Sequence, residues 1–254
     1  MLSITILGSG TSHGVPMIGC HCEVCTSSDP RDRRTRPSAV FCIDGHNALI
    51  DTSPELRLQL VAAGIDYAEA VLYTHDHADH LHGIDDVRRF NELLNRPVPI
   101  YAAPHVLRSI QVRYPYIFAR QMTGGGIPSL ELHGIDGPFD LFGRTVTPVP
   151  VWHGETPVFG YRVDGAAYVT DTNHIPPASR VLLQDLDVLI LDALRREPHP
   201  THFNFEQALE MVAMLKPKQT YFTHLTHTTL HAGVDLALPD HVALAYDGLR
   251  LDLP

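Results

Sequence analysis

Apolar and polar positions alternate along the chain in two rhythms. Short apolar runs, bounded by turn-forming or charged residues, are typical of buried strands. They predict strands over residues 5–7, 39–43, 48–51, 70–74, 97–101, 141–151, 157–163, 166–170, 188–191, 219–223, 242–245 and 249–252. Helical spacing predicts helices over residues 54–63, 81–93, 104–113, 178–184 and 205–216.

Two of these helices carry clear boundary signals. An apolar stripe runs from Phe205 to Leu215, and Asn204 and Gln207 have the spacing of a capping box. In the first helix, Ser53 is expected to act as the N-cap, with Pro54 at the first helical position, and the helix should end at Gly64.

Strands and helices mix in both halves of the chain. This mixture predicts a layered α/β sandwich of two similar halves, and 254 residues suit one domain spanning residues 1–254. Residues 115–140 are rich in glycine and proline, and so long an irregular segment is a candidate lid or subunit contact.

The composition narrows the range of partners. The net charge of −10 argues against extended nucleic acid or an anionic membrane surface, because both need a basic protein face. No apolar run approaches the roughly 20 residues of a membrane span. The first residues lack the basic start and apolar region of a secretion signal, so we expect a cytoplasmic protein.

Three of the four cysteines, Cys20, Cys22 and Cys25, lie within six residues. Three thiols cannot all pair with one another, and the cytosol is reducing, so disulfides explain them poorly. Thiolates at this spacing suit a structural zinc, which needs one further ligand. A chance cluster of free thiols is the alternative.

The 17 histidines are numerous for this length, and four of them fall between residues 74 and 83. There His75, His77, Asp79 and His80 follow a predicted strand within one short loop. The spacing permits two adjacent metal sites, one at His75 and His77 and the other at Asp79 and His80. A metal is favoured because imidazoles and carboxylates buried without one would lack partners. A solvated polar turn is the alternative. His153, Asp171 and His224, which follow other strands, are candidates for the remaining ligands.

Together these residues resemble the signature of the metallo-β-lactamase-fold hydrolases over essentially the whole chain. The resemblance implies a four-layer αβ/βα sandwich. It assigns His75, His77 and His153 to one metal, and Asp79, His80 and His224 to the other, with Asp171 bridging both. It also implies that Asp51 supports the loops that carry these ligands.

A narrower resemblance, to PhnP-type phosphoribosyl 1,2-cyclic phosphate phosphodiesterases, lies in residues 19–25 and 223–227. It implies a structural zinc held by Cys20, Cys22, Cys25 and His227, so that about three metals bind per chain. It further implies manganese or zinc in the catalytic pair, a small phosphodiester substrate, and a homodimer.

In this interpretation a hydroxide that bridges the two catalytic metals attacks phosphorus. The resemblance implies that His202 is a catalytic residue, with His199 as the alternative candidate for that role. We also expect Asp79 to be a catalytic residue. Alternatives on the same metal site are a ribonuclease Z-like nuclease, a thioester or lactone hydrolase, and a non-catalytic binding module. The run Arg31, Arg33, Arg34 and Arg36 is either a contact for a second phosphate or a solvated loop.

Overall fold

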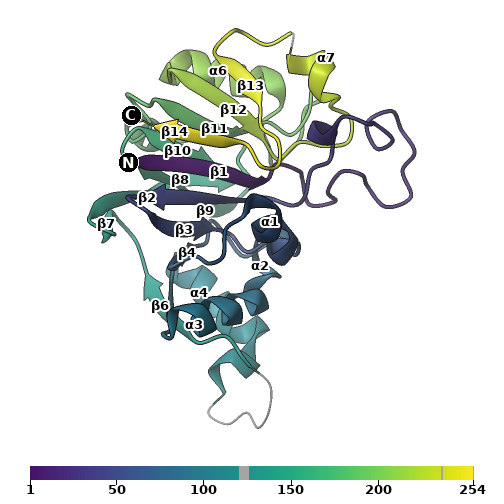
Figure 1. Cartoon of the computed structure of the whole chain (residues 1–254). Helices are drawn as coiled ribbons and strands as arrows, with labels where there is room; N and C mark the ends of the chain where they lie inside the picture. The colour runs from purple at the N-terminus through teal and green to yellow at the C-terminus, as the bar shows by residue number, and fades with distance from the viewer. Residues whose placement is uncertain (120–125, 236, 254) are drawn as a thin grey trace.

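The computed structural model describes residues 1–119, 126–235 and 237–253, and in it two mixed sheets pack face to face (Figure 1). The first sheet has the strand order β14-β1-β2-β3-β4-β5-β6. Its strands are β1 Leu2–Gly8, β2 Ser38–Ile43, β3 His46–Ile50, β4 Ala70–Leu72, β5 Val98–Ala102, β6 Leu130–Gly134 and β14 Arg250–Leu253. The two ends of the chain are neighbours, since β1 and β14 pair antiparallel with Leu2 opposite Leu253.

The second sheet has the order β13-β12-β11-β10-β9-β8-β7. Its strands are β7 Phe139–Leu141, β8 Arg144–His153, β9 Thr156–Val163, β10 Ala166–Val169, β11 Val188–Asp192, β12 Gln219–Thr223 and β13 Val242–Leu244. Strands β10 to β13 are parallel, as are β3 to β6 in the first sheet. The carboxyl ends of parallel strands meet at one edge of a sheet, which is where ligand sites form in α/β folds.

Helices cover the outer face of each sheet. They are α1 Leu56–Ala63, α2 Ala78–Leu81, α3 Arg88–Leu94, α4 Pro104–Arg113, α5 Pro177–Val181, α6 Phe205–Leu215 and α7 His231–Asp235. Short 3₁₀ turns occur at Pro30–Asp32, Ile84–Val87 and Pro115–Phe118. In the described ranges, no helix is long and apolar enough to cross a membrane.

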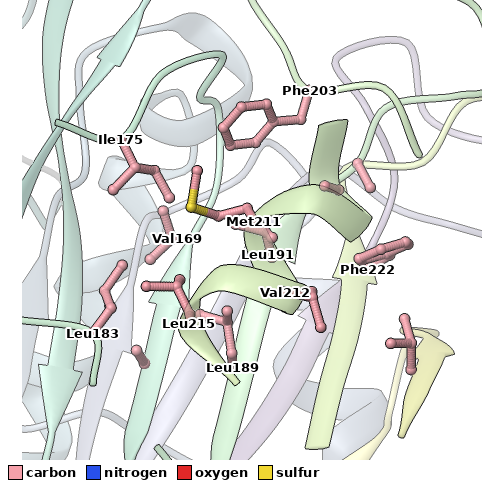
Figure 2. Packing of buried hydrophobic residues seen from close by; sticks show 14 of the residues in the cluster. Val169, Ile175, Leu183, Leu189, Leu191, Phe203, Met211, Val212, Leu215 and Phe222 are labelled. Carbon is pink, nitrogen blue, oxygen red and sulfur yellow. The ribbon is translucent and has the colours of Figure 1, made fainter. Parts of the chain in front are cut away.

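Three buried apolar clusters separate these layers. One lies between the sheets and joins Ile4 and Phe41 of the first sheet to Tyr161 and Ile190 of the second. Another joins α1, α3 and α4 to the first sheet. The third packs α6 against the second sheet, as Figure 2 shows around Leu191. The predicted αβ/βα sandwich is confirmed by this layering.

Several local predictions need correction. The helix expected over residues 81–93 is broken into α2, the 3₁₀ turn Ile84–Val87 and α3. Helix α1 begins only at Leu56 and has Glu55, not Ser53, at its N-cap; the Ser53 hydroxyl donates to the Gln59 side chain and accepts from the Glu55 backbone N–H at 3.3 Å. Its end at Gly64, with a φ of 66°, is confirmed. The capping box of α6, Asn204 with Gln207, is also confirmed.

The segment 115–140 is more regular than predicted. It contributes β6, which pairs parallel with β5 and extends the first sheet, and it contributes β7 to the second. Residues 120–125 of this segment lie outside the described ranges. Sequence patterns missed these strands because they lie at sheet edges, where apolar alternation is weak; β6 is partly exposed along its length.

Leu191 tests the core beneath α6. Its side chain is fully buried, so Leu191→Ala should lower the free energy of unfolding by about 2–5 kcal/mol, measured by urea denaturation. Leu58→Ala is the matched control, because Leu58 is 56% exposed on α1 and its loss should change stability little. Equal effects of the two substitutions would contradict the assigned packing.

Candidate metal centre

The predicted ligands come together at the carboxyl edge shared by the two sheets. The loop after β4 carries His75 and His77, and α2 carries Asp79 and His80. The second sheet supplies three further residues, each at or just after the end of a strand: His153, Asp171 and His224.

Backbone conformation helps to aim some of these side chains. Asp51, Asp171 and His224 have φ angles of 59°, 52° and 64°, in the left-handed region that non-glycine residues rarely occupy. All three follow the end of a parallel strand, so the chain turns sharply there. Such strain persists only where surrounding contacts impose it, and it clusters at functional sites.

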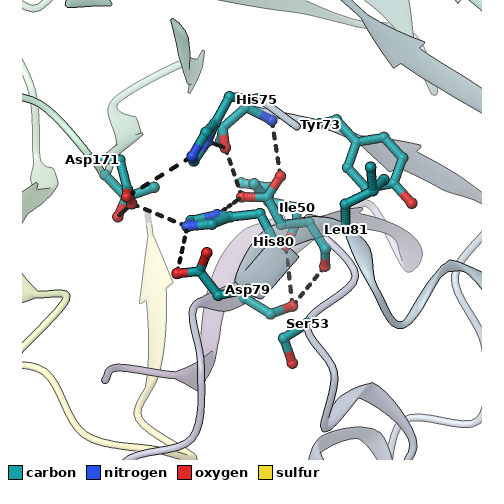
Figure 3. Close-up of polar contacts among 12 residues, drawn as sticks. Ile50, Ser53, Tyr73, His75, Asp79, His80, Leu81 and Asp171 are labelled. Carbon is teal, nitrogen blue, oxygen red and sulfur yellow. Dashed lines mark hydrogen bonds and ion pairs between the residues drawn. The ribbon is translucent and has the colours of Figure 1, made fainter. Parts of the chain in front are cut away.

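The gathered side chains form two sets of possible metal ligands that share one aspartate. In each set the donor atoms lie within 4.8 Å of one another. The first set is His75, His77, His153 and Asp171; the second is Asp79, His80, Asp171 and His224. Figure 3 shows Asp171 facing both His75 and His80. Its carboxylate lies 3.2 Å from His80 Nε2 and 3.3 Å from His224 Nε2.

These residues fit a pair of divalent cations. Nε2 atoms of His75, His80 and His224 are buried without a hydrogen-bond partner in the described chain, which is costly unless a cation fills that role. Burial lowers the pKa of both His75 and His153, which favours the neutral imidazole that binds metal. Mixed imidazole and carboxylate donors suit zinc, manganese or iron.

Asp51 orients the ligand loop from behind. It is fully buried and accepts hydrogen bonds from the Thr74 backbone N–H and the Thr74 hydroxyl, both at 2.8 Å. It also lies 2.7 Å from His80 Nδ1. When that nitrogen donates to Asp51, the lone pair of His80 Nε2 points into the centre, an arrangement typical of metal-ligating histidines.

A second donor cluster lies outside the centre. Cys20, Cys22, Cys25 and His227 place their donor atoms within 4.8 Å of one another, and the Cys20 and Cys22 sulfurs lie 3.3 and 3.4 Å from His227 Nδ1. Burial raises the pKa of the Cys25 thiol to about 11. A cation would therefore have to stabilise its thiolate, and three sulfurs with one nitrogen fit tetrahedral zinc.

His202 lies next to the two ligand sets that share Asp171, but it belongs to neither of them. Its ring stacks on His224 at 4.7 Å and lies 4.6 Å from His153. His202 Nδ1 is 2.8 Å from the buried carboxylate of Asp192. Burial disfavours the charged imidazole, but the charge and hydrogen bond of Asp192 outweigh it and raise the pKa of His202 to about 9. His199 lies farther out, 5.1 Å from the His202 ring.

Sequence reasoning missed Asp192, although it is the last residue of β11 and obeys the rule that identified the other polar residues at strand ends. It also missed Asp76. The Asp76 carboxylate accepts hydrogen bonds from Ser109 at 2.6 Å and Arg113 at 3.0 Å, which tie α4 to the loop between His75 and His77.

The arginines at residues 31–36 do not form a surface that is free to bind a phosphate group. Arg31 pairs with Asp29, Arg34 with buried Asp32, and Arg36 with Glu55. Arg34 also donates to the backbone carbonyl of Thr226 at 3.2 Å, so this run holds the cysteine loop in place. Of the four guanidinium groups, three therefore bind carboxylates of the chain itself.

The family follows from a profile described as "Beta-lactamase superfamily domain", which matches residues 46–225. A crystal structure described as a new diphosphatase from the PhnP family is 46% identical and has a TM-score of 0.92, covering 98% of this chain and 96% of that one. The chain belongs to the beta-lactamase superfamily and to its PhnP family.

Two further relatives widen the comparison. A Porphyromonas gingivalis protein named octanoyltransferase is 40% identical over 96% of this chain, but the match spans only 50% of that protein's length. Zinc-bound PqqB from Methylobacterium extorquens has a TM-score of 0.80 at 21% identity, covering 99% of this chain and 100% of that one, and so shows the shared fold. The fold implies divalent metal binding.

Gly83 tests the packing that presents His80. A Cβ at Gly83 would lie 2.0 Å from the Ser53 carbonyl oxygen, so Gly83→Ala should push the loop after Asp51 away from α2. We expect a loss of about 1–3 kcal/mol in unfolding free energy and less bound metal, measured by denaturation and elemental analysis. Gly137→Ala, which meets no atom within 4 Å, should change neither.

Proposed function

We propose that the protein hydrolyses a small cyclic phosphodiester, such as phosphoribosyl 1,2-cyclic phosphate, at a two-metal centre. The two donor sets that share Asp171, with His202 beside them, carry this proposal. The likeness to a PhnP-family diphosphatase supports it. His75, His77 and His153 would hold one metal, Asp79, His80 and His224 the other, and Asp171 both.

When bound, divalent cations supply Lewis acidity, which lowers the pKa of water and offsets the negative charge of a phosphate. Zinc or manganese suits these donors. Asp79 would bind a metal of the second set, where its carboxylate lies 3.5 Å from His80 and 3.7 Å from His224, and we propose that it also orients the attacking water.

His202 supplies the proton in this proposal. Asp192 accepts a hydrogen bond from His202 Nδ1, so Nε2 of the protonated ring also carries a hydrogen. That N–H can donate to a phosphoryl oxygen as charge develops, or protonate the leaving alkoxide. Asp192 acts through His202 by orienting the ring and stabilising its charge.

The cysteine cluster is proposed as a structural zinc site. Its fourth member, His227, is three residues beyond His224, on the loop that follows β12. A zinc bound by Cys20, Cys22, Cys25 and His227 would join this loop to the long segment after β1. The proposed metal count is therefore about three per chain.

A ribonuclease Z-like activity is the less favoured alternative. It needs a basic surface to hold RNA, whereas this chain carries a net charge of −10 and only two lysines, Lys216 and Lys218. A thioester or lactone hydrolase could use the same metals, but it would leave the His202–Asp192 pair without an evident role. A small phosphodiester substrate uses every part of the site.

Cys22→Ser tests the structural zinc. Elemental analysis of the purified protein should find about three metals per chain, and this substitution should remove one zinc while the other two metals stay. Cys42→Ser is the control, because Cys42 lies on β2 outside the cluster. Zinc content that is the same in both variants and in the unsubstituted protein would refute the assignment.

His202→Ala tests the proposed acid. With metals bound, the protein should cleave bis(p-nitrophenyl) phosphate, and this substitution should lower kcat by about 10²–10⁴-fold because the general acid is lost. His105→Ala, at an exposed position on α4, should leave kcat unchanged. Absence of phosphodiester cleavage by the fully metal-loaded protein would exclude the proposed function.

A further inference from the structure

His77 is the least supported histidine of the two donor sets. It is exposed, whereas the other members of its set are buried. Among the described residues, its ring contacts His75 and His153, and no hydrogen bond to the ring is found. His224 is buried and stacks on His202, and the three other histidines have an oxygen atom of the chain within 2.9 Å of Nδ1: His75, His80 and His153. The His77 imidazole therefore depends on its backbone for its position.

Helix α4 holds the residue that comes directly before His77. The Asp76 carboxylate accepts hydrogen bonds from the Ser109 hydroxyl at 2.6 Å and from the Arg113 guanidinium at 3.0 Å. Arg113 also donates to the Asp76 backbone carbonyl. That carbonyl is part of the peptide bond between Asp76 and His77, and a peptide bond is planar. The guanidinium therefore fixes both the Asp76 side chain and the peptide plane from which His77 begins.

Helix α4 is itself anchored in the core. Val106 and Ile110 are fully buried and belong to the apolar cluster that joins this helix to the first sheet. Ser109 and Arg113 are four residues apart, so their side chains lie on the same side of the helix, one turn apart. Contacts from two turns of an anchored helix can hold the Asp76 peptide at a constant place relative to the first sheet.

The contacts of Arg113 are poorly explained by folding alone. Its side chain is 41% exposed, and an ion pair at such a position typically adds little to stability. Residues that orient metal ligands from behind have a larger effect, because replacing them typically weakens metal binding by about 10- to 100-fold. Asp51 has such a position behind His80, and Asp76 with its two partners on α4 has the corresponding position behind His77.

We propose that Arg113 and Ser109 are positioning residues, which hold Asp76 so that His77 points at the first donor set and completes the binding of its divalent cation. Neither residue belongs to a donor set, so both act through His77. The inference rests on the two-metal arrangement of the proposed function, but not on its substrate. It implies that the two cations are held unequally, because the first set includes an exposed ligand that needs this support.

Arg113→Gln tests this role by equilibrium dialysis of the manganese-loaded protein against buffers of fixed free Mn²⁺, followed by elemental analysis. We expect the affinity for one manganese to fall by about 10- to 100-fold, because His77 loses its support, while the affinity for the other is unchanged. A direct effect of charge would act in the opposite direction, since removing a positive group near a cation favours cation binding. Ser109→Ala should weaken binding of the same manganese.

Arg108→Gln is the matched control, because Arg108 is exposed on the same helix and takes no part in the contacts to Asp76. It should leave both manganese affinities unchanged. An equal loss of affinity in Arg108→Gln and Arg113→Gln would indicate a general effect of α4 and would overturn the inference.

Diffraction at the manganese absorption edge shows which site is affected. Crystals of Arg113→Gln are kept at a free Mn²⁺ concentration between the two affinities. The manganese signal should then be weak at His75, His77 and His153, and full at Asp79, His80 and His224. Equal signals at the two sets, or a loss at the second set alone, would contradict the proposed role.

These results are separable from the proposed function. Loss of manganese from the first set in Arg113→Gln, without cleavage of any diester by the loaded wild type, supports the inference while the proposed function fails. Cleavage by the wild type, together with two manganese affinities that Arg113→Gln leaves unchanged, supports the function and overturns the inference.

Discussion

The arrangement of the candidate site depends on one constraint: imidazoles and carboxylates are buried at the edge where strands of both sheets end. Polar groups removed from water need partners, and several nitrogen atoms of this centre have no hydrogen-bond partner within the described chain. Left-handed turns at Asp171 and His224, and the hydrogen bonds of Asp51, hold the donor atoms in this costly arrangement. Divalent cations are the partners that make such a cluster stable, so fold and metal site have to be understood together.

The two sheets divide the work of the site. The first supplies the loop that carries His75 and the short helix α2 that carries His80. Asp51 holds both through hydrogen bonds to Thr74 and His80. The second supplies Asp171 between the donor sets, and it also positions the His202–Asp192 pair. The groups proposed to bind metal thus lie at strand ends, on the loop after β4 and on α2, and His202 lies on a loop where Asp192 at the end of β11 holds its ring.

The cysteine loop and a neighbouring cleft share their walls. Residues from the segments 11–17 and 226–228 line this cleft of about 270 Å³ beside His202, and the second segment includes His227 of the sulfur cluster. Arg34 fastens the same region by binding both Asp32 and the Thr226 carbonyl. A structural ion there would set the shape of this cleft as well as the stability of the loop.

Local patterns in the sequence were enough to predict the layered fold, the α6 capping box and the principal donor residues, because strand ends and histidine spacing are local features. Only the tertiary structure revealed the broken helix after Leu81, the partners of the arginine run, and the role open to Asp192. Each of these depends on which residues from remote segments meet in space: Gly83 touches Ser53, and Arg34 meets Thr226. Periodicity carries no information about such contacts, since packing between layers decides them.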